Sequence, residues 1–330
     1  DTWFWSMELG FDSLSPSMKV FSGNSNIQLA EDICSYLGLT LGKLKLTKFS
    51  DGELSVAFEE NIRNEIVFII QSTNPPAENI LELMLILDAA KRASAKSIIA
   101  VIPYFGYGRQ DRKDKPRVPI SSRMILDMIS GIGVNRIVSM DLHSPQIQGF
   151  VNVPFDHLYS RMALLAKLKQ IGLNEQTGVV LAPDVGSAKM SQAYAKSLAI
   201  GFALIDKRRP KANKAVVANL IGELDNKHVL IIDDMIDTAG TICNAAKAAL
   251  DNGALSVTAV ATHPVLSGSA ITRLEKSEIV KVIVCNTINV RKEQIFEKLE
   301  IISVANVFGE AIKRIIDGTS LSSMFRELKG

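Results

Sequence analysis

The chain has 330 residues, of which 47% are hydrophobic and 22% charged, and its formal net charge is +2. This length suits two domains, and the composition excludes disordered and membrane-embedded classes of protein. The nearly balanced charge gives no general attraction to nucleic acid or to an anionic membrane, and no apolar run approaches the roughly 20 residues that span a bilayer. The cysteines lack the spacing of metal ligands and are typical of core residues in a reducing compartment, so we expect a cytoplasmic protein; they are Cys34, Cys243 and Cys285.

Residues 1–17 differ from the rest of the chain. They contain no lysine or arginine but hold both tryptophans. Without a basic or arginine-rich segment, this stretch is typical of neither a signal peptide nor a transit peptide. A strand-like run begins at Met18, so we interpret residues 1–17 as a disordered extension of unknown purpose.

The middle of the chain alternates apolar strands with amphipathic helices, which predicts an α/β fold with a mostly parallel sheet. One strand–helix–strand unit has its strands at residues 67–72 and 97–102. A similar unit, displaced by about 160 residues, has its strands at 229–234 and 256–261. If this is a true repeat, the fold occurs twice with a boundary near residue 160. Chance similarity between two common units is the alternative.

A basic loop, residues 104–117, follows the strand that ends at Ile102. Its glycines and aromatic residues give way to a stretch, residues 109–117, in which seven of nine residues are charged. Arginine makes planar, bidentate contacts with phosphate and stacks on bases. The loop therefore suits a polyphosphate ligand such as ATP, and a solvated surface loop is the alternative interpretation.

Two other strand ends carry candidate metal ligands. His143 follows the apolar run 137–140, two residues after Asp141, and Asp184 follows the run 179–182. Carboxyl ends of parallel strands meet at one edge of a sheet, where ligands bind. Imidazole and carboxylate groups ligate divalent ions, although a lone histidine is also common as a structural residue.

A second basic loop spans residues 205–214 and contains Lys207 and Arg209. It lacks aromatic residues, which together with the balanced net charge argues against a nucleic-acid surface. Lysine and arginine directed at a transferring phosphoryl group would stabilise the charge of the transition state.

The segment 229–241 is the most informative. A buried strand ends at two acidic residues, Asp233 and Asp234, and a small-sided loop then opens a helix. Phosphate binds at the N-terminus of a helix, while carboxylates accept hydrogen bonds from sugar hydroxyls or hold Mg²⁺. The segment suits a phosphorylated sugar, with a plain acidic surface turn as the alternative. The first unit has Gln71-Ser72 at the equivalent place, so we expect this site only once. The loop consists of Asp237, Thr238, Ala239, Gly240 and Thr241.

This segment resembles the phosphoribosyl-diphosphate (PRPP) motif of phosphoribosyltransferase-like proteins. From Met18 to about Leu328 the chain resembles the ribose-phosphate diphosphokinase family, the PRPP synthetases, and most of all its phosphate-activated, ADP-inhibited branch. Five motifs occur in the family's order: residues 49–53, the loop 109–115, residues 141–143 with 146–150, the loop 207–213, and the sugar-phosphate loop.

The resemblance implies two tandem phosphoribosyltransferase-like domains, each a mostly parallel sheet flanked by helices. Residues 18–160 would carry the ATP side and a regulatory, allosteric surface. Residues 161–330 would carry the ribose 5-phosphate site, with the last helix packed on the N-terminal domain. The family also forms hexamers, so we expect a homo-oligomer.

The implied reaction transfers the β,γ-diphosphoryl group of MgATP to O1 of ribose 5-phosphate, giving PRPP and AMP for nucleotide biosynthesis. The implied cofactor is Mg²⁺ and the implied activator is inorganic phosphate. The matching residues are Phe49, Asp51, Gly52 and Glu53 (ATP, from a neighbouring subunit), Arg109 and Gln110 (ATP), His143 and Asp184 (Mg²⁺), Lys207 and Arg209 (catalysis), and Arg209, Asp233, Asp234, Asp237, Thr238, Ala239, Gly240 and Thr241 (ribose 5-phosphate).

Three positions depart from the family pattern. Ser187 stands where a second glycine is usual, Met190 replaces an arginine, and Pro145 follows Ser144 in the presumed regulatory segment. Two rival functions therefore stay open. One is a non-catalytic, synthetase-associated regulatory subunit, and the other is a phosphoribosyltransferase that consumes PRPP.

Overall fold

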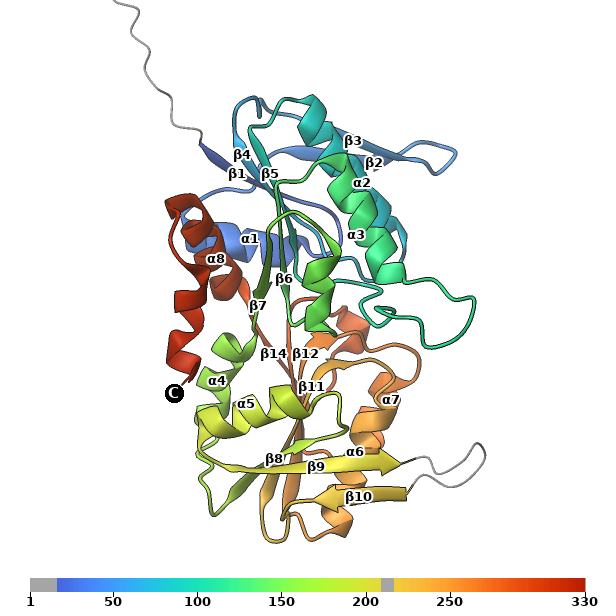
Figure 1. Ribbon diagram of the computed structural model, residues 1–330, viewed down its shortest axis with the longest axis vertical. Coiled ribbons are helices and arrows are strands. Elements are labelled where there is room, and N and C mark those ends of the chain that lie inside the picture. Colours follow the sequence, from blue (N-terminus) through green and yellow to red (C-terminus); the bar gives the residue numbers. More distant parts are fainter. Residues whose placement is uncertain (1–16, 209–216, 330) are drawn as a thin grey trace, which may run out of the picture.

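A computed structural model describes residues 17–208 and 217–329 (Figure 1). The expectation for residues 1–16 and the role expected of Arg209 lie outside these ranges. Ser17 already belongs to the fold, because its carbonyl accepts a hydrogen bond of 3.0 Å from the backbone N–H of Ile66. No helix in the described part of the chain is long and apolar enough to cross a membrane.

The first half is built on a five-stranded parallel sheet with the order β1-β4-β5-β6-β7, beside a separate antiparallel hairpin of β2 and β3. Its elements are β1 (Met18–Ser22), α1 (Ile27–Leu37), β2 (Leu44–Lys48), β3 (Leu54–Phe58), β4 (Ile66–Ile70), α2 (Glu78–Arg92), β5 (Ser97–Ile102), α3 (Ser121–Ile132), β6 (Arg136–Met140), η1 (Pro145–Phe150), β7 (Phe155–Leu158) and α4 (Arg161–Lys169).

The second half is built on a seven-stranded sheet with the order β10-β9-β8-β11-β12-β13-β14, in which only the β9–β10 pairing is antiparallel. Its elements are β8 (Gly178–Ala182), α5 (Ala188–Leu198), β9 (Gly201–Arg208), β10 (Val217–Ile221), β11 (His228–Ile236), α6 (Gly240–Asp251), β12 (Ser256–Pro264), α7 (Ala270–Lys276), β13 (Lys281–Cys285), η2 (Lys292–Gln294), β14 (Leu299–Ile302), α8 (Ala305–Asp317) and η3 (Leu321–Lys329).

The two halves repeat each other element for element, from β1 through α4 and from β8 through α8. The central strands also pair in the same register, Val67 opposite Ile98 in the first sheet and Val229 opposite Val257 in the second. This correspondence favours duplication over chance similarity of two units. It also confirms the α/β fold of two halves with a mostly parallel sheet in each.

The central strands form because their residues are apolar in unbroken runs, as expected for parallel strands covered on both faces. Helices α2 and α3 cover one face of the first sheet, and α6 and α7 cover the equivalent face of the second (Figure 1). A third apolar core on the opposite face contains residues of both halves, among them Phe68, Leu165, Tyr194 and Phe308. The halves are therefore joined by a continuous core.

The last helix of each half packs against the other half. Helix α4 packs on α5, and α8 packs on α1, beside which it lies in Figure 1. The α1–α8 approach is close because Gly309 has no side chain: a Cβ there would come within 2.3 Å of the Tyr36 ring. The Tyr36 hydroxyl also bonds to the Glu310 carboxylate at 3.1 Å. This exchange fixes the relative placement of the two sheets.

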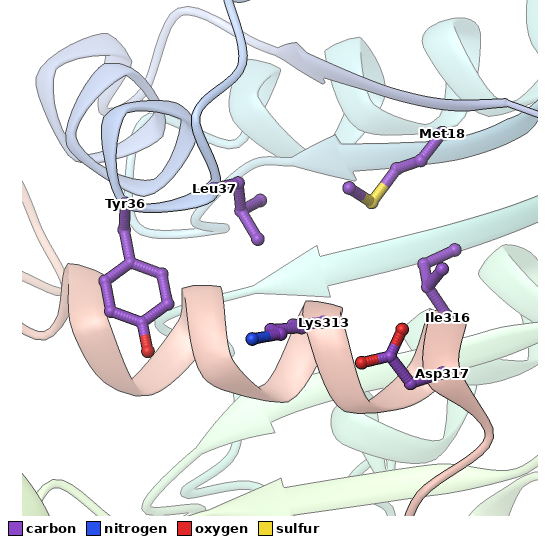
Figure 2. A pocket seen from close by; sticks show the side chains of 6 residues that line it. All are labelled: Met18, Tyr36, Leu37, Lys313, Ile316 and Asp317. Atoms are coloured by element: carbon purple, nitrogen blue, oxygen red, sulfur yellow. The ribbon is translucent and has the colours of Figure 1, made fainter.

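A hollow of about 330 Å³ opens between β1, α1 and α8, and Figure 2 shows its lining. Met18, the first residue of β1, is part of that lining. The hollow thus lies at the amino end of the strand, opposite to the edge where ligands of such sheets bind. It carries no part of the site described below.

Candidate active site between the two sheets

The carboxyl ends of the two sheets face each other across the junction of the halves. The Ser72 hydroxyl, just past β4, donates a hydrogen bond of 2.6 Å to the carbonyl of Thr287, just past β13. The amide of Asn26, which caps α1, donates to the carbonyl of Asn286 at 2.8 Å. In open α/β sheets ligands bind beyond these strand ends. The junction therefore brings two ligand-binding edges together.

His143 and Asp234 meet across this junction. The Nδ1 atom of His143 lies 2.7 Å from Oδ2 of Asp234. The hydrogen bond to Asp234 raises the pKa of His143 above its ordinary value, although burial opposes the shift. Burial by itself raises the pKa of Asp234, but the hydrogen bond and charge of His143 outweigh it and lower that pKa. The two groups form a hydrogen-bonded pair that links the halves at the site.

Asp233 has the opposite environment. Burial, followed by the negative charges of Asp234 and Asp184, raises its pKa well above the ordinary value. Its Oδ1 accepts the backbone N–H of Asp234 at 2.9 Å. Asp184, Asp233 and Asp234 therefore share this edge of the sheet, and His143 is hydrogen-bonded to only one of them, Asp234. A positive or hydrogen-bond-donating ligand would relieve the repulsion among the three carboxylates.

The predicted sugar-phosphate loop lies between β11 and α6. Ala239 adopts a left-handed conformation with φ of 62°, so that the chain turns directly into α6 at Gly240. The first turn of a helix leaves backbone N–H groups without intrahelical partners, and its dipole favours anions. Arg273 of α7 steadies the loop by donating from Nη1 to the carbonyl of Thr238 at 2.8 Å.

Asp237 at the start of this loop is bonded to the basic loop of the first half. Nη1 of Arg109 donates to its Oδ2 at 2.5 Å, and the hydroxyl of Ser267 donates to its Oδ1. Burial by itself raises the pKa of Asp237, but the hydrogen bonds of Ser267 and Arg109 outweigh it and lower that pKa. The predicted ATP residue Arg109 and the predicted sugar-phosphate loop are thus in direct contact.

Asp184 lies at the end of β8, on the same edge as Asp233. Its Oδ1 accepts the backbone N–H of Ser187 at 3.1 Å, and its carbonyl accepts the Ser187 hydroxyl at 3.1 Å. The unusual serine is therefore engaged within its own turn. Met190 packs against the shared core, so the place of the family's arginine is apolar here.

The other predicted ATP residues are not gathered at this edge. Residues 49–53 form the turn of the β2–β3 hairpin, which projects from the first half away from β11 and α6 (Figure 1). Phe49 is 59% exposed there, and Gly52 holds the turn with φ of 96°. Gln110 lies next to Arg109, but its side-chain oxygen accepts the hydroxyl of Ser121 at 2.5 Å.

The second basic loop is described only at its start. The backbone of Lys207 belongs to β9 and is paired with Ala218 of β10. Arg209 lies beyond the described residues. Strands β9 and β10, which flank this loop, lie at one side of the seven-stranded sheet, next to β8.

The donor set suits a hard divalent cation. Carboxylate oxygens and an imidazole are available from Asp184, Asp233, Asp234 and His143, and oxygen is the ligand atom that Mg²⁺ prefers. Within residues 17–208 and 217–329, no three His, Cys, Asp or Glu side chains are already converged on one point. A bound ion would therefore take part of its shell from substrate phosphate or water, as Mg²⁺ commonly does.

Several residues at the junction were missed by sequence reasoning. Thr262 and His263 lie near the end of β12 and contact Asp141, the residue that follows β6. Their signal was available, since they are polar residues at the end of an apolar strand of a parallel sheet. Arg273 and Ser267 carried no such signal, because nothing in the local pattern shows that they reach the sugar-phosphate loop.

Comparison with known proteins gives concordant results. A family model for the N-terminal domain of ribose phosphate pyrophosphokinase matches residues 18–133, and one for the phosphoribosyl synthetase-associated domain matches residues 206–326. The ribose-phosphate pyrophosphokinase of Chlorobaculum tepidum is 51% identical, over 93% of this chain and 95% of that protein. The enzyme of the same name from Caldanaerobacter subterraneus is 48% identical, over 94% and 98%.

A solved structure agrees with these relatives. The phosphoribosylpyrophosphate synthetase of Mycobacterium smegmatis superimposes with a TM-score of 0.86 at 33% identity. The match covers 92% of this chain and 99% of that one. The similarity thus includes both halves and the junction between them.

Proposed function

The chain belongs to the ribose-phosphate pyrophosphokinase family, and from this premise we propose that it makes PRPP and AMP from ATP and ribose 5-phosphate. The observation that carries the proposal is the junction itself. Asp233 and Asp234 lie beside a helix N-terminus, and Arg109 and His143 of the other half reach the same place. A phosphorylated sugar and a polyphosphate would be neighbours there.

Ribose 5-phosphate is proposed to bind on the second half. Its phosphate would lie in the loop of residues 237–241, at the N-terminus of α6, where backbone N–H groups and the helix dipole favour an anion. Asp233 and Asp234 would accept hydrogen bonds from the ribose hydroxyls. The contact of Arg109 with Asp237 supports an ATP site directly beside the sugar.

ATP is proposed to bind to Arg109 and Gln110 of one subunit and to residues 49–53 of a neighbour. The exposure of Phe49 at a projecting hairpin supports this division, because within one chain the hairpin does not reach the site. The site would then be complete only in a homo-oligomer, proposed to be a hexamer. Light scattering of the purified protein would measure the assembly.

Mg²⁺ is the proposed cofactor, with His143 and Asp184 among its ligands. When bound, it would neutralise charge on the polyphosphate. The role of the chain is to place these ligands on facing edges and to supply Lys207 and Arg209. These two residues would stabilise charge on the diphosphoryl group during its transfer. In the reaction, O1 of ribose 5-phosphate forms a bond to the β-phosphorus of ATP. The bond from that phosphorus to the oxygen that bridges it to the α-phosphorus breaks, and AMP leaves with the electron pair. The O1 proton goes to solvent.

Activation by inorganic phosphate and inhibition by ADP are proposed from the loop that resembles the regulated branch, residues 109–115 followed by 119–121. The loop is folded back on α3, since the backbone N–H of Ser122 donates to the carbonyl of Gln110 at 3.2 Å. A cytoplasmic location is proposed because all three cysteines are free thiols, as is usual in a reducing compartment.

The test is AMP release from MgATP by the purified protein, with and without ribose 5-phosphate, over a range of inorganic phosphate concentrations. We expect AMP only when the sugar is present, with stimulation by phosphate. AMP that forms without the sugar would contradict diphosphoryl transfer.

The rival functions give different results in the same experiment. A folded oligomer that releases no AMP would indicate a non-catalytic subunit, a function that the enzymatic relatives do not favour. Consumption of PRPP in the presence of a nucleobase would indicate a phosphoribosyltransferase. AMP release that saturates with ribose 5-phosphate but does not respond to inorganic phosphate would support the catalytic activity. It would contradict the assignment to the phosphate-activated branch.

A further inference from the structure

The turn that carries His143 is held mainly by hydrogen bonds to its first residue, Asp141. Asp141 is 4% exposed and has a φ of 37°, a left-handed conformation that is strained for a residue with a side chain. Its backbone N–H donates to the carbonyl of Leu158 at 3.0 Å. The next N–H, of Leu142, donates to Nε2 of His157 at 3.0 Å. The surrounding structure must hold this turn, because the backbone would not adopt it by preference.

Two of the hydrogen bonds that hold this turn come from the other half of the molecule. Oδ2 of Asp141 accepts the hydroxyl of Thr262 at 2.7 Å, and the carbonyl of Asp141 lies 3.1 Å from Nε2 of His263. Both residues lie near the end of β12 of the second sheet, and both are buried, with exposures of 1% and 2%. The end of a strand in the second half is thus hydrogen-bonded to the end of a strand in the first half.

The hydrogens of this contact can be assigned. The hydroxyl of Thr262 donates to the Asp141 carboxylate, which only accepts, so the hydroxyl of Ser160, 2.7 Å away, donates to Thr262. The backbone N–H of Ser160 also donates to Oδ2 of Asp141, at 3.0 Å. The carboxylate therefore receives two direct donors, and one of them, the Thr262 hydroxyl, is aligned by the hydroxyl of Ser160.

The ring of His263 is likewise fixed. Burial lowers its pKa, so the ring is neutral and carries one N–H. The carbonyl of Asp141 can only accept, which places that hydrogen on Nε2. Nδ1 lies 2.8 Å from the hydroxyl oxygen of Thr287, which is also 3.2 Å from the carbonyl of Thr262. The Tyr104 ring of the first half packs edge-on against His263, with centroids 4.9 Å apart.

We propose that Thr262 and His263 are positioning residues, which act through Asp141 to hold His143 in place opposite Asp234. His143 is only two residues from Asp141, and its ring is 42% exposed, with Asp234 as its hydrogen-bond partner. The hydrogen bonds from β12 add a second constraint, through the backbone of the turn, and make the site depend on correct docking of the halves. This inference rests on the proposed function, because it assigns a purpose to the placement of His143.

Thr262 offers a matched pair of substitutions. Thr262→Val keeps the shape and removes the hydroxyl donor, whereas Thr262→Ser keeps the donor. A displacement of about 1 Å at a catalytic group typically costs about 100-fold in rate. We therefore expect kcat of Thr262→Val to fall by about 10- to 100-fold, while Thr262→Ser stays within about threefold of wild type. KM for ribose 5-phosphate should stay within about twofold, because its proposed loop follows β11 and is not touched by Thr262.

His263 offers a second pair, which keeps the inference testable if Thr262→Val does not fold. Glutamine places an amide near the position of Nε2, and asparagine places one near Nδ1. His263→Gln should retain the contact with Asp141 and most of kcat. His263→Asn should retain only the contact with Thr287 and lose kcat as Thr262→Val does.

Hydrogen exchange gives a readout that does not need activity. Amide exchange in peptides covering residues 141–144 should rise severalfold in Thr262→Val and His263→Asn, but not in peptides covering residues 237–241. Equal kcat in Thr262→Val and wild type, or a lowered melting temperature as its only change, would overturn the inference. If wild type itself releases no AMP, the proposed function fails, and hydrogen exchange alone decides whether β12 holds the turn.

Discussion

The two halves of the molecule have the same order of elements, but their equivalent strand ends have opposite characters. Gln71 follows β4 where Asp233 lies in β11, as the common register shows. Gln71 is 1% exposed and fully bonded: its Oε1 accepts from the N–H and hydroxyl of Ser25, and its Nε2 donates to the carbonyl of Asn79 and to Glu82. Asp233 instead has a raised pKa among other carboxylates.

The comparison shows how one architecture yields a structural edge and a binding edge. At the first edge every polar group of Gln71 is used inside the protein, so nothing remains for a ligand. At the second edge negative charge accumulates without enough internal partners. The first half contributes in another way, through Arg109 and His143, which reach across to the second edge. Function therefore lies in the difference between the halves.

The largest effect should come from Lys207, near the end of β9 in the second half. Lys207→Ala should lower kcat by about 10³- to 10⁵-fold, the range for a cation that stabilises a transferring phosphoryl group. The measurement is AMP release, with light scattering to show that assembly is intact. Lys45→Ala, which removes an exposed lysine from the hairpin of the first half, is the matched control. Substantial activity in Lys207→Ala would remove this lysine from the mechanism.

The next effect tests the two edges directly. Asp233→Gln gives the second edge the residue of the first, and we expect kcat to fall by about 10²- to 10³-fold, because the carboxylate that would accept from the sugar hydroxyls becomes a longer, neutral amide. Folding should be unimpaired or improved, since a half-buried carboxylate with repelling neighbours disappears. Asp251→Gln, at the exposed end of α6, should change neither quantity. An active Asp233→Gln variant would show that the edges do not differ in function.

A change at the first edge should affect stability alone. Gln71→Leu leaves the N–H of Ser25 and the carboxylate of Glu82 without their buried partner, which should lower the free energy of unfolding by about 1–3 kcal/mol. Urea denaturation measures this loss, and kcat of the folded protein should be unchanged. Gln28→Leu, on the exposed side of α1, should change stability by no more than about 0.5 kcal/mol. A loss of activity without loss of stability would mean that the first edge also binds a ligand.

Local patterns were sufficient to predict the strand, loop and helix that became β11 and α6, because each is encoded by adjacent residues. Apolar runs without alternation predicted parallel strands covered on both faces, and the fold confirms them. The individual roles given to the site residues stay predictions. The structure adds that His143 lies against Asp234 and Arg109 against Asp237.

What the sequence did not reveal depends on how the halves face each other. The contact of Asp141 with Thr262 joins residues 121 positions apart, and no periodicity links them. The burial of Gln71 was equally hidden, since a polar residue after an apolar strand predicts a ligand contact as readily as an internal one. Long-range geometry, and not local propensity, decides between these outcomes.

The smallest effect concerns the ion pair that joins the halves, Arg109 with Asp237. The pair is partly exposed, at 50% and 26% for the two side chains, so Asp237→Asn should lower the free energy of unfolding by only about 0.2–1 kcal/mol. Because the folded pKa of Asp237 is lowered, this contribution is fully present above the ordinary aspartate value of about 3.9 and is lost as pH falls through the folded value.

The stability difference between wild type and Asp237→Asn, measured by urea denaturation without substrates, should therefore be constant from about pH 5 to 8 and shrink below about pH 4. High salt should reduce it as well. Asp88→Asn, which breaks an exposed pair with Arg92 within α2, should give a smaller difference, because that pair joins residues of one helix and is more exposed. If the two variants behave alike, the ion pair adds nothing to the docking of the halves. That task would then belong to the shared core and to the buried hydrogen bonds of Asp141.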